Sequence, residues 1–141
     1  MELTRRAHGF VLVAGLVLSG CHTRVDGVYR LDLEQTKQCV EKTAAADAEA
    51  GQLKDQTIKL LEATQVELRL DPDGKLLSTT VLSSAGPATA KTSGTWQVDG
   101  KRVTFKVPGD ADTSCDVDGD RLRCEKQTAN KLFGHYVLVR K

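Results

Sequence analysis

Thiols, imidazoles and clustered carboxylates are the side chains of this sequence that could perform chemistry. His22 and His135 each stand alone, because neither has a second histidine four residues away, as a helical zinc motif needs. Cys39 could act as a nucleophile, but no histidine lies near it in the chain. The sequence also holds no Gly-x-Ser-x-Gly elbow and no phosphate loop. We therefore expect no catalytic residue, no cofactor and no enzyme activity; an enzyme would need polar groups converging on His135.

Aspartates gather in two parts of the chain, and oxygen-rich loops of this kind can hold Ca²⁺. The spacing Asp71-x-Asp73-Gly74 fits the start of an EF-hand loop, which requires a glutamate at its twelfth position. The twelfth residue counted from Asp71 is Leu82, so the motif fails. The second group alternates along the chain, which places its carboxylates on one solvated face of a strand: Asp110, Asp112, Asp116, Asp118 and Asp120. We expect turns and surface there, and no metal site.

The N-terminus has the three parts of a secretory signal peptide. Arg5 and Arg6 give a positive start, and the uncharged apolar run 10–18 follows. This run is shorter than the ~20 apolar residues that a membrane-spanning helix needs. Small residues then lead to a cysteine, in the order Leu18-Ser19-Gly20-Cys21.

Leu18-Ser19-Gly20-Cys21 resembles the lipobox of bacterial lipoproteins. The resemblance implies cleavage before Cys21 and acylation of its thiol and new amino group, which together anchor the protein stably. His22 stands where that family often has an aspartate that retains proteins in the inner membrane, so the outer membrane is implied. The expected organisation is a signal peptide at 1–20, a lipidated tether at 21–26 and one domain at 27–141. The alternative is an ordinary secreted protein that is cleaved beside a cysteine.

The charge of the expected mature chain is balanced. Removal of residues 1–20 takes away Glu2, Arg5 and Arg6 and leaves equal numbers of acidic and basic side chains. No basic stripe remains to bind a phosphate backbone, so nucleic acid is not expected as a partner. Aromatic residues are scarce, and the core must therefore consist mainly of valine and leucine.

The pattern of apolar residues predicts strands that are interrupted once by helix. Residues 25–33 alternate as a first strand does, and 34–63 are rich in Ala, Glu, Gln, Lys and Leu without proline, which favours helix. Gly51 divides that segment into two helices or leaves it whole. From residue 65 onward the chain reads as strands and tight turns. Asp99-Gly100 is expected to turn a hairpin that sets Trp96 opposite Val103.

The next hairpin places two cysteines side by side. If Gly119 and Asp120 form a two-residue turn, Cys115 faces Cys124 in a non-hydrogen-bonded pair, with Cα atoms ~4.5 Å apart. That distance suits a disulfide, which the oxidising envelope favours. The competing bridge would join Cys39 of the helix to one of these strands.

Successive short connections indicate an up-and-down antiparallel meander of about eight strands, which can close into a barrel without exposed edges. Gly27-Val28-Tyr29 resembles the Gly-x-Trp of the lipocalin-like (calycin) family, with tyrosine in place of tryptophan, and Arg140 stands where that family has a basic residue packing on the aromatic. The fatty-acid-binding branch also has helices between its first two strands, as 34–63 would be. The fold class expected is mainly β with one helical insertion. An open sheet with the helix across one face is the rival.

These features predict an envelope lipoprotein that is a non-enzymatic binding module for a small apolar ligand. The expected partners are the membrane, through lipidated Cys21, and either that ligand or an envelope protein. The alternative role is that of an inhibitor, immunity or assembly factor with a packed interior. Candidate binding residues on the inner face are Tyr29, Trp96, Phe105 and Arg140.

Overall fold

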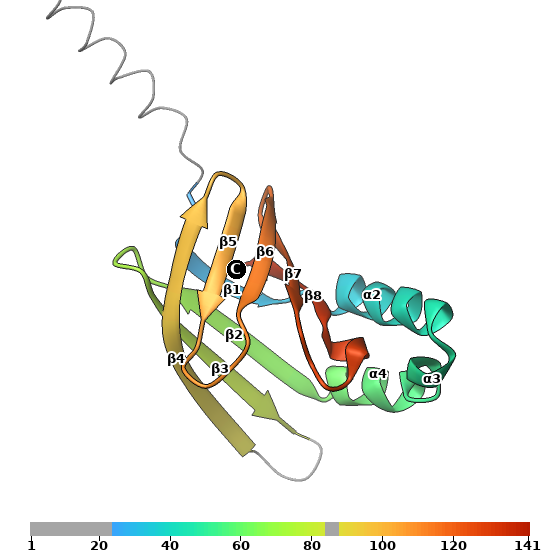
Figure 1. Ribbon diagram of the computed structural model, residues 1–141. Helices are drawn as coiled ribbons and strands as arrows, with labels where there is room; N and C mark the ends of the chain where they lie inside the picture. Colours follow the sequence, from blue (N-terminus) through green and yellow to red (C-terminus); the bar gives the residue numbers. More distant parts are fainter. Residues whose placement is uncertain (1–23, 84–87) are drawn as a thin grey trace, which may run out of the picture.

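The computed structural model describes residues 24–83 and 88–141 (Figure 1). Cys21 and His22 lie outside these residues, so the predicted lipobox and its neighbour have no structural description. Within the two described ranges, no helix is both long enough and apolar enough to cross a membrane.

Eight antiparallel strands form a closed barrel (Figure 1). Each strand pairs with the next along the chain, and β8 pairs with β1, which confirms the predicted up-and-down meander and excludes the open sheet. The strands are β1 (Gly27–Leu31), β2 (Thr64–Leu70), β3 (Lys75–Leu82), β4 (Ala88–Asp99), β5 (Arg102–Lys106), β6 (Thr113–Asp118), β7 (Arg121–Lys126) and β8 (His135–Arg140).

Alternation along the strands fills the barrel with apolar side chains. In β5, Val103 and Phe105 are buried while Arg102 and Lys106 are exposed. The buried core inside the barrel continues around the wall with Val25, Tyr29, Leu68, Leu70, Leu76, Cys115, Leu122, Cys124 and Leu138. Valine and leucine dominate this core, as the scarcity of aromatic residues requires.

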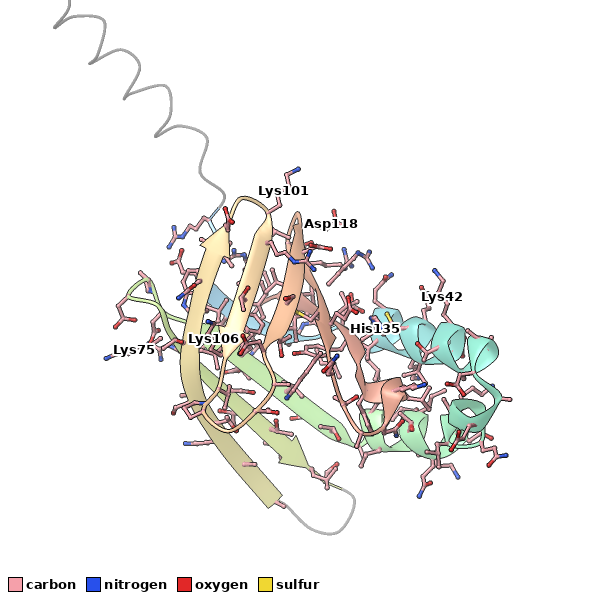
Figure 2. The ribbon with its side chains drawn as sticks, in the orientation of Figure 1. Lys42, Lys75, Lys101, Lys106, Asp118 and His135 are labelled. Atoms are coloured by element: carbon pink, nitrogen blue, oxygen red, sulfur yellow. A yellow bond between two sulfur atoms is a disulfide. The ribbon has the colours of Figure 1, made fainter. Side chains whose placement is uncertain are left out.

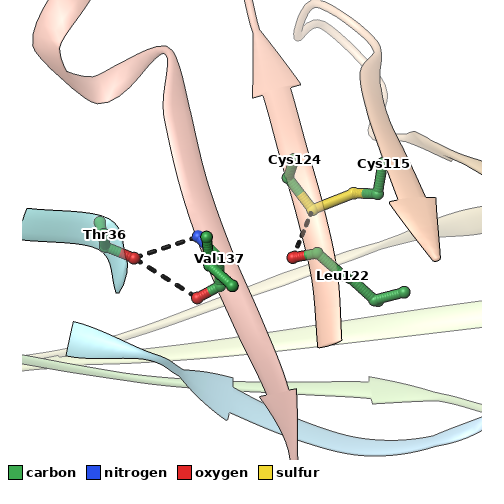
Figure 3. Close-up of a disulfide and its surroundings, with 5 residues drawn as sticks. All are labelled: Thr36, Cys115, Leu122, Cys124 and Val137. Atoms are coloured by element: carbon green, nitrogen blue, oxygen red, sulfur yellow. Dashed lines mark hydrogen bonds between the residues drawn. A yellow bond between two sulfur atoms is a disulfide. The ribbon is translucent and has the colours of Figure 1, made fainter. Parts of the chain in front are cut away.

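The hairpin of β6 and β7 has the predicted register. Asp118 pairs with Arg121, and Cys115 pairs with Cys124. A disulfide joins these two cysteines between the neighbouring strands, on their buried face, with Cα atoms 4.0 Å apart (Figure 3). Cys39 keeps a free thiol, so the competing bridge to the helix is wrong.

The hairpin of β4 and β5 turns one residue later than predicted. Asp99 is the last residue of β4 and pairs with Arg102, which puts Trp96 opposite Phe105 and not opposite Val103. Gly100 has a φ of 61° and is the first of the two turn residues, as a type II′ turn favours. The prediction placed glycine second. The displacement does not change which face each side chain occupies, because each partner moves by two positions.

Three helices, not one or two, occupy the predicted helical segment between β1 and β2: α2 (Leu33–Ala46), α3 (Ala48–Gly51) and α4 (Lys54–Glu62). The first break falls at Asp47, whose backbone is extended and whose carboxylate accepts hydrogen bonds from the N–H groups of Glu49 and Ala50, both at 3.1 Å. Asp47 thus ends one helix and caps the next. The second break follows Gly51.

The helices have a small core of their own at one end of the barrel. Val40 and Ala50 are buried against Leu132, which belongs to the short 3₁₀ helix η1 (Lys131–Phe133) that precedes β8. The side chain of Lys131 binds Asp47 at 3.1 Å. The turn before β8 therefore fastens the helical segment to the barrel.

We predict that replacing both bridged cysteines with alanine lowers the free energy of unfolding by about 2–4 kcal/mol, because the bridge restricts the unfolded chain. Urea denaturation measures this loss. The control Cys39→Ser should change stability by less than about 1 kcal/mol, since that thiol is free and only half-buried. Equal losses in the two variants would contradict a structural role specific to the bridge.

Candidate functional site

The barrel wall has an opening because β1 is short. β1 pairs with β2 only from Glu67 to Leu70, and with β8 only from Leu138 to Arg140. The first residues of β2 and of β8 therefore extend beyond β1 on either side of the opening. In Figure 1 the helical segment lies at this end of the barrel.

The start of α2 takes the place of a longer β1 beside β8. The N–H of Asp32 donates to the carbonyl of Val137 at 2.8 Å. The hydroxyl of Thr36 accepts from the N–H of Val137 at 3.0 Å and donates to its carbonyl at 3.4 Å (Figure 3). Thr36 is 1% exposed, so these bonds form away from water. They satisfy the backbone of β8 where its strand partner ends.

Asp32 fixes the first turn of α2 from two sides. Its carboxylate accepts from the N–H of Gln35 at 3.1 Å and from Nε of Arg121 at 3.0 Å. Burial alone would raise the pKa of Asp32, but these two hydrogen bonds together with the charges of Arg121 and Arg30 hold the pKa below its ordinary value. The carboxylate is therefore ionised at neutral pH, and its stabilising contribution is lost only as the pH falls through this lowered pKa.

An apolar pocket of about 410 Å³, here called the mouth pocket, lies between the opening and the helices. Leu60 and Leu61 of α4 and Leu132 and Phe133 of η1 form its helical side. Strand residues at this end of the barrel form its other side: Thr64, Val66, Thr80, Leu82, Tyr136 and Leu138. A concave, mainly apolar space of this size is typical of small-molecule sites.

A smaller, open space of about 180 Å³, here called the inner chamber, adjoins the mouth pocket and has the exposed residues Thr92 and Asp110 at its rim. The two spaces share Val66, Tyr136 and Leu138. The inner chamber has apolar walls that include Phe105, and it also has polar side chains from five strands and one loop: Ser78, Thr92, Asp110, Thr113, Lys126 and Tyr136. Lys126 and Asp110 form an ion pair there.

Tyr136 stands where the two spaces meet. Burial raises the pKa of its hydroxyl, and a hydrogen bond with Thr113 only partly offsets that rise. The hydroxyl therefore stays protonated at neutral pH and can donate a hydrogen bond. Tyr136 was not among the residues that the sequence suggested; the signal for it is its inward position in the alternation of β8.

The opposite end of the barrel is sealed by the predicted aromatic–arginine contact. The guanidinium of Arg140 lies 5.0 Å from the centre of the Tyr29 ring, and its nitrogens donate to the carbonyls of Asp26 at 2.7 Å and Arg24 at 3.0 Å. The Tyr29 hydroxyl donates to the carbonyl of Val25 at 2.7 Å. We call this the sealed end.

The four predicted binding residues thus have different places. Tyr29 and Arg140 hold the sealed end together. Trp96 is half-buried and its indole N–H donates to the carbonyl of Asp71 at 2.9 Å, which ties two hairpins together. Phe105 lines the inner chamber. The apolar residues of the helices that line the mouth pocket were not identified from the sequence.

His135 and Cys39 line a polar groove of about 360 Å³ outside the barrel, between α2 and the sheet. Figure 2 shows His135 at the start of β8 beside α2, near Lys42. Among the residues that the structure describes, no group of three or more His, Cys, Asp or Glu side chains could hold a metal ion.

Comparison of the chain with protein-family models, with curated proteins and with solved structures gave no match.

We predict that Thr36→Val destabilises the protein by about 1–3 kcal/mol, because the buried N–H of Val137 loses its acceptor while the side-chain volume is kept and the Val137 carbonyl still accepts from Asp32. The amide of Val137 should also exchange its hydrogen faster. The control Thr36→Ser keeps the hydroxyl and should preserve slow exchange at Val137. If exchange in Thr36→Val stays as slow as in the parent protein, the hydroxyl does not hold this edge.

Proposed function

We propose that this protein is a lipid-anchored envelope protein that binds a small apolar ligand in the mouth pocket and catalyses no reaction. The observation that supports this most is the apolar wall of the mouth pocket, built by α4, η1 and the ends of β2, β3 and β8. Leu60 in that wall is 40% exposed, although it faces a concave space. A bound apolar molecule would cover this surface.

The energy available from such burial is sufficient for binding. Each methylene group removed from water contributes ~0.8 kcal/mol. A medium-length chain therefore gains several kcal/mol, from which the cost of immobilising the ligand must be subtracted. We expect dissociation constants of about 1–100 μM for single-chain amphiphiles.

The described chain begins at the end of the barrel opposite to the mouth pocket. The described chain begins at Arg24, which contacts Arg140 at the sealed end. Figure 2 shows Lys101 and Asp118 at hairpin tips of that end, whereas Lys42 and His135 lie beside the helices. If Cys21 is lipidated, the tether of a few residues attaches at the sealed end. The mouth pocket then opens away from the anchoring lipid surface.

The lipocalin-like resemblance supports the same proposal. Its expected contact between Arg140 and Tyr29 is present, and helices connect the first two strands. These features agree with membership of that family, whose small barrels bind ligands in their interiors.

A second candidate is a protein-interaction role, in which a partner inserts an apolar side chain into the mouth pocket. The exposure of Leu53 (43%) at the start of α4, in addition to that of Leu60, favours it. A small apolar molecule that competes with the partner would show that the two roles use one site.

We predict that the protein binds the uncharged dye N-phenyl-1-naphthylamine, and that Thr80→Trp weakens this binding by about 10-fold or more, because the indole fills the mouth pocket. Dye fluorescence in a titration measures the dissociation constant.

The matched control for that titration is Leu77→Trp. Leu77 lies on the same strand but faces outward and is 37% exposed, so the dissociation constant should stay within about 2-fold of the parent value. If the dye shows no saturable binding to the parent protein, the ligand-binding proposal is contradicted. Equal weakening by both variants would place the dye elsewhere.

We predict that Cys21→Ser releases the protein from membranes or leaves it unprocessed, because acylation of the Cys21 thiol is the proposed anchor. Fractionation and intact-mass measurement of the membrane-bound protein check this. Mature Cys21→Ser protein that still fractionates with membranes would refute the anchor.

A further inference from the structure

We propose that the ligand is an uncharged amphiphile, with its apolar chain in the mouth pocket and a neutral hydrogen-bonding head in the inner chamber. This inference rests on the proposed function and specifies the chemical class of the ligand. It follows from how polar and charged groups are divided between the two adjoining spaces.

The two spaces differ in the groups that they offer. The helical side of the mouth pocket consists of leucines and a phenylalanine together with Thr36, whose hydroxyl is already bound to Val137, and this mainly apolar side suits a hydrocarbon chain. The inner chamber adds hydroxyl groups to its apolar walls: Ser78, Thr92, Thr113 and Tyr136. Because Tyr136 borders both spaces, a molecule whose chain lies in the mouth pocket can place its head among these hydroxyls.

The charges in the inner chamber are already balanced. Asp110 and Lys126 are the charged side chains of its described lining, and they bind each other. The hydrogen bond from Lys126 is the main reason that the pKa of Asp110 lies below its ordinary value, so the carboxylate is ionised at neutral pH. One positive and one negative charge leave no net charge for a ligand to neutralise.

A charged head would therefore be poorly matched. A carboxylate would face Asp110 and would have to compete with it for Lys126, and an ammonium group would face Lys126 in the same way. Either head would meet one like charge and one opposite charge that is already paired, so it would gain little net attraction from this partly exposed ion pair, in which the side chain of Asp110 is 48% exposed. An alcohol, ester or amide head can instead exchange hydrogen bonds with the chamber hydroxyls and leave the ion pair intact. Medium-chain alcohols and monoacylglycerols belong to this class.

The test uses three probes with the same chain: decanol, decanoate and decylamine. Their binding to the full protein is measured at pH 8, where decanoate carries a negative charge and decylamine a positive one. Displacement of N-phenyl-1-naphthylamine gives the dissociation constants. Decanol should bind tightest, and each charged probe should bind about 10-fold or more weakly.

Two substitutions separate this charge matching from a general preference for uncharged molecules. Asp110→Asn leaves Lys126 without its partner and should strengthen decanoate binding by about 10-fold while leaving decylamine weak. Lys126→Gln leaves Asp110 without its partner and should strengthen decylamine binding by a similar factor. The control Lys91→Gln removes a positive charge from an exposed position of β4 that lines neither space. It should change none of the preferences.

The outcomes distinguish this inference from the proposed function. Preference of the parent protein for decanoate or decylamine would overturn the neutral head while preserving ligand binding. Unchanged preferences in correctly folded Asp110→Asn and Lys126→Gln, checked by circular dichroism, would show that the head does not lie beside the ion pair and would also overturn it. If the parent protein binds neither the dye nor any of the three probes, the proposed function itself is contradicted.

Discussion

The length of β1 is the constraint on which the rest of the structure depends. β1 ends at Leu31, whereas the first residues of β2 and β8 extend further at that end of the barrel. Without another partner, the backbone groups of β8 there would be left unpaired in a mainly apolar environment. The chain resolves this by starting a helix at once: the N–H of Asp32 and the hydroxyl of Thr36 bind Val137. An unsatisfied buried backbone group costs about 1–3 kcal/mol, which explains why the helical segment is held at this end.

The same constraint gives the barrel two different ends. At the sealed end, full strand pairing brings Arg140 onto Tyr29 and draws residues 24–26 across the barrel, leaving a packed interior around the disulfide. At the helical end, the missing length of β1 leaves room that the leucines of α4 and η1 line without filling. The packed core that stabilises the barrel and the proposed binding pocket thus lie in separate halves of the barrel. The helical half can therefore expose apolar surface without any loss from the packed core.

Local rules were enough to predict the barrel, because strand alternation and tight turns carry their own signals. The Cys115–Cys124 register followed from counting outward from Gly119. The same counting failed by one turn position at Gly100, because a glycine in a two-residue turn can stand first or second. The mouth pocket could not be predicted, since it depends on where β1 ends and on the contact of Leu132 with the helices. Both are long-range features. The helix break at Asp47 was also not predicted from the sequence.

The central claim is that the helical end of this barrel holds an apolar molecule. Native mass spectrometry of the protein released gently from its own envelope tests it most directly. We predict one non-covalent adduct per chain, with the mass of a neutral single-chain amphiphile, and its loss from the Thr80→Trp protein. A parent protein that carries no adduct, or an adduct retained unchanged by Thr80→Trp, would contradict the claim.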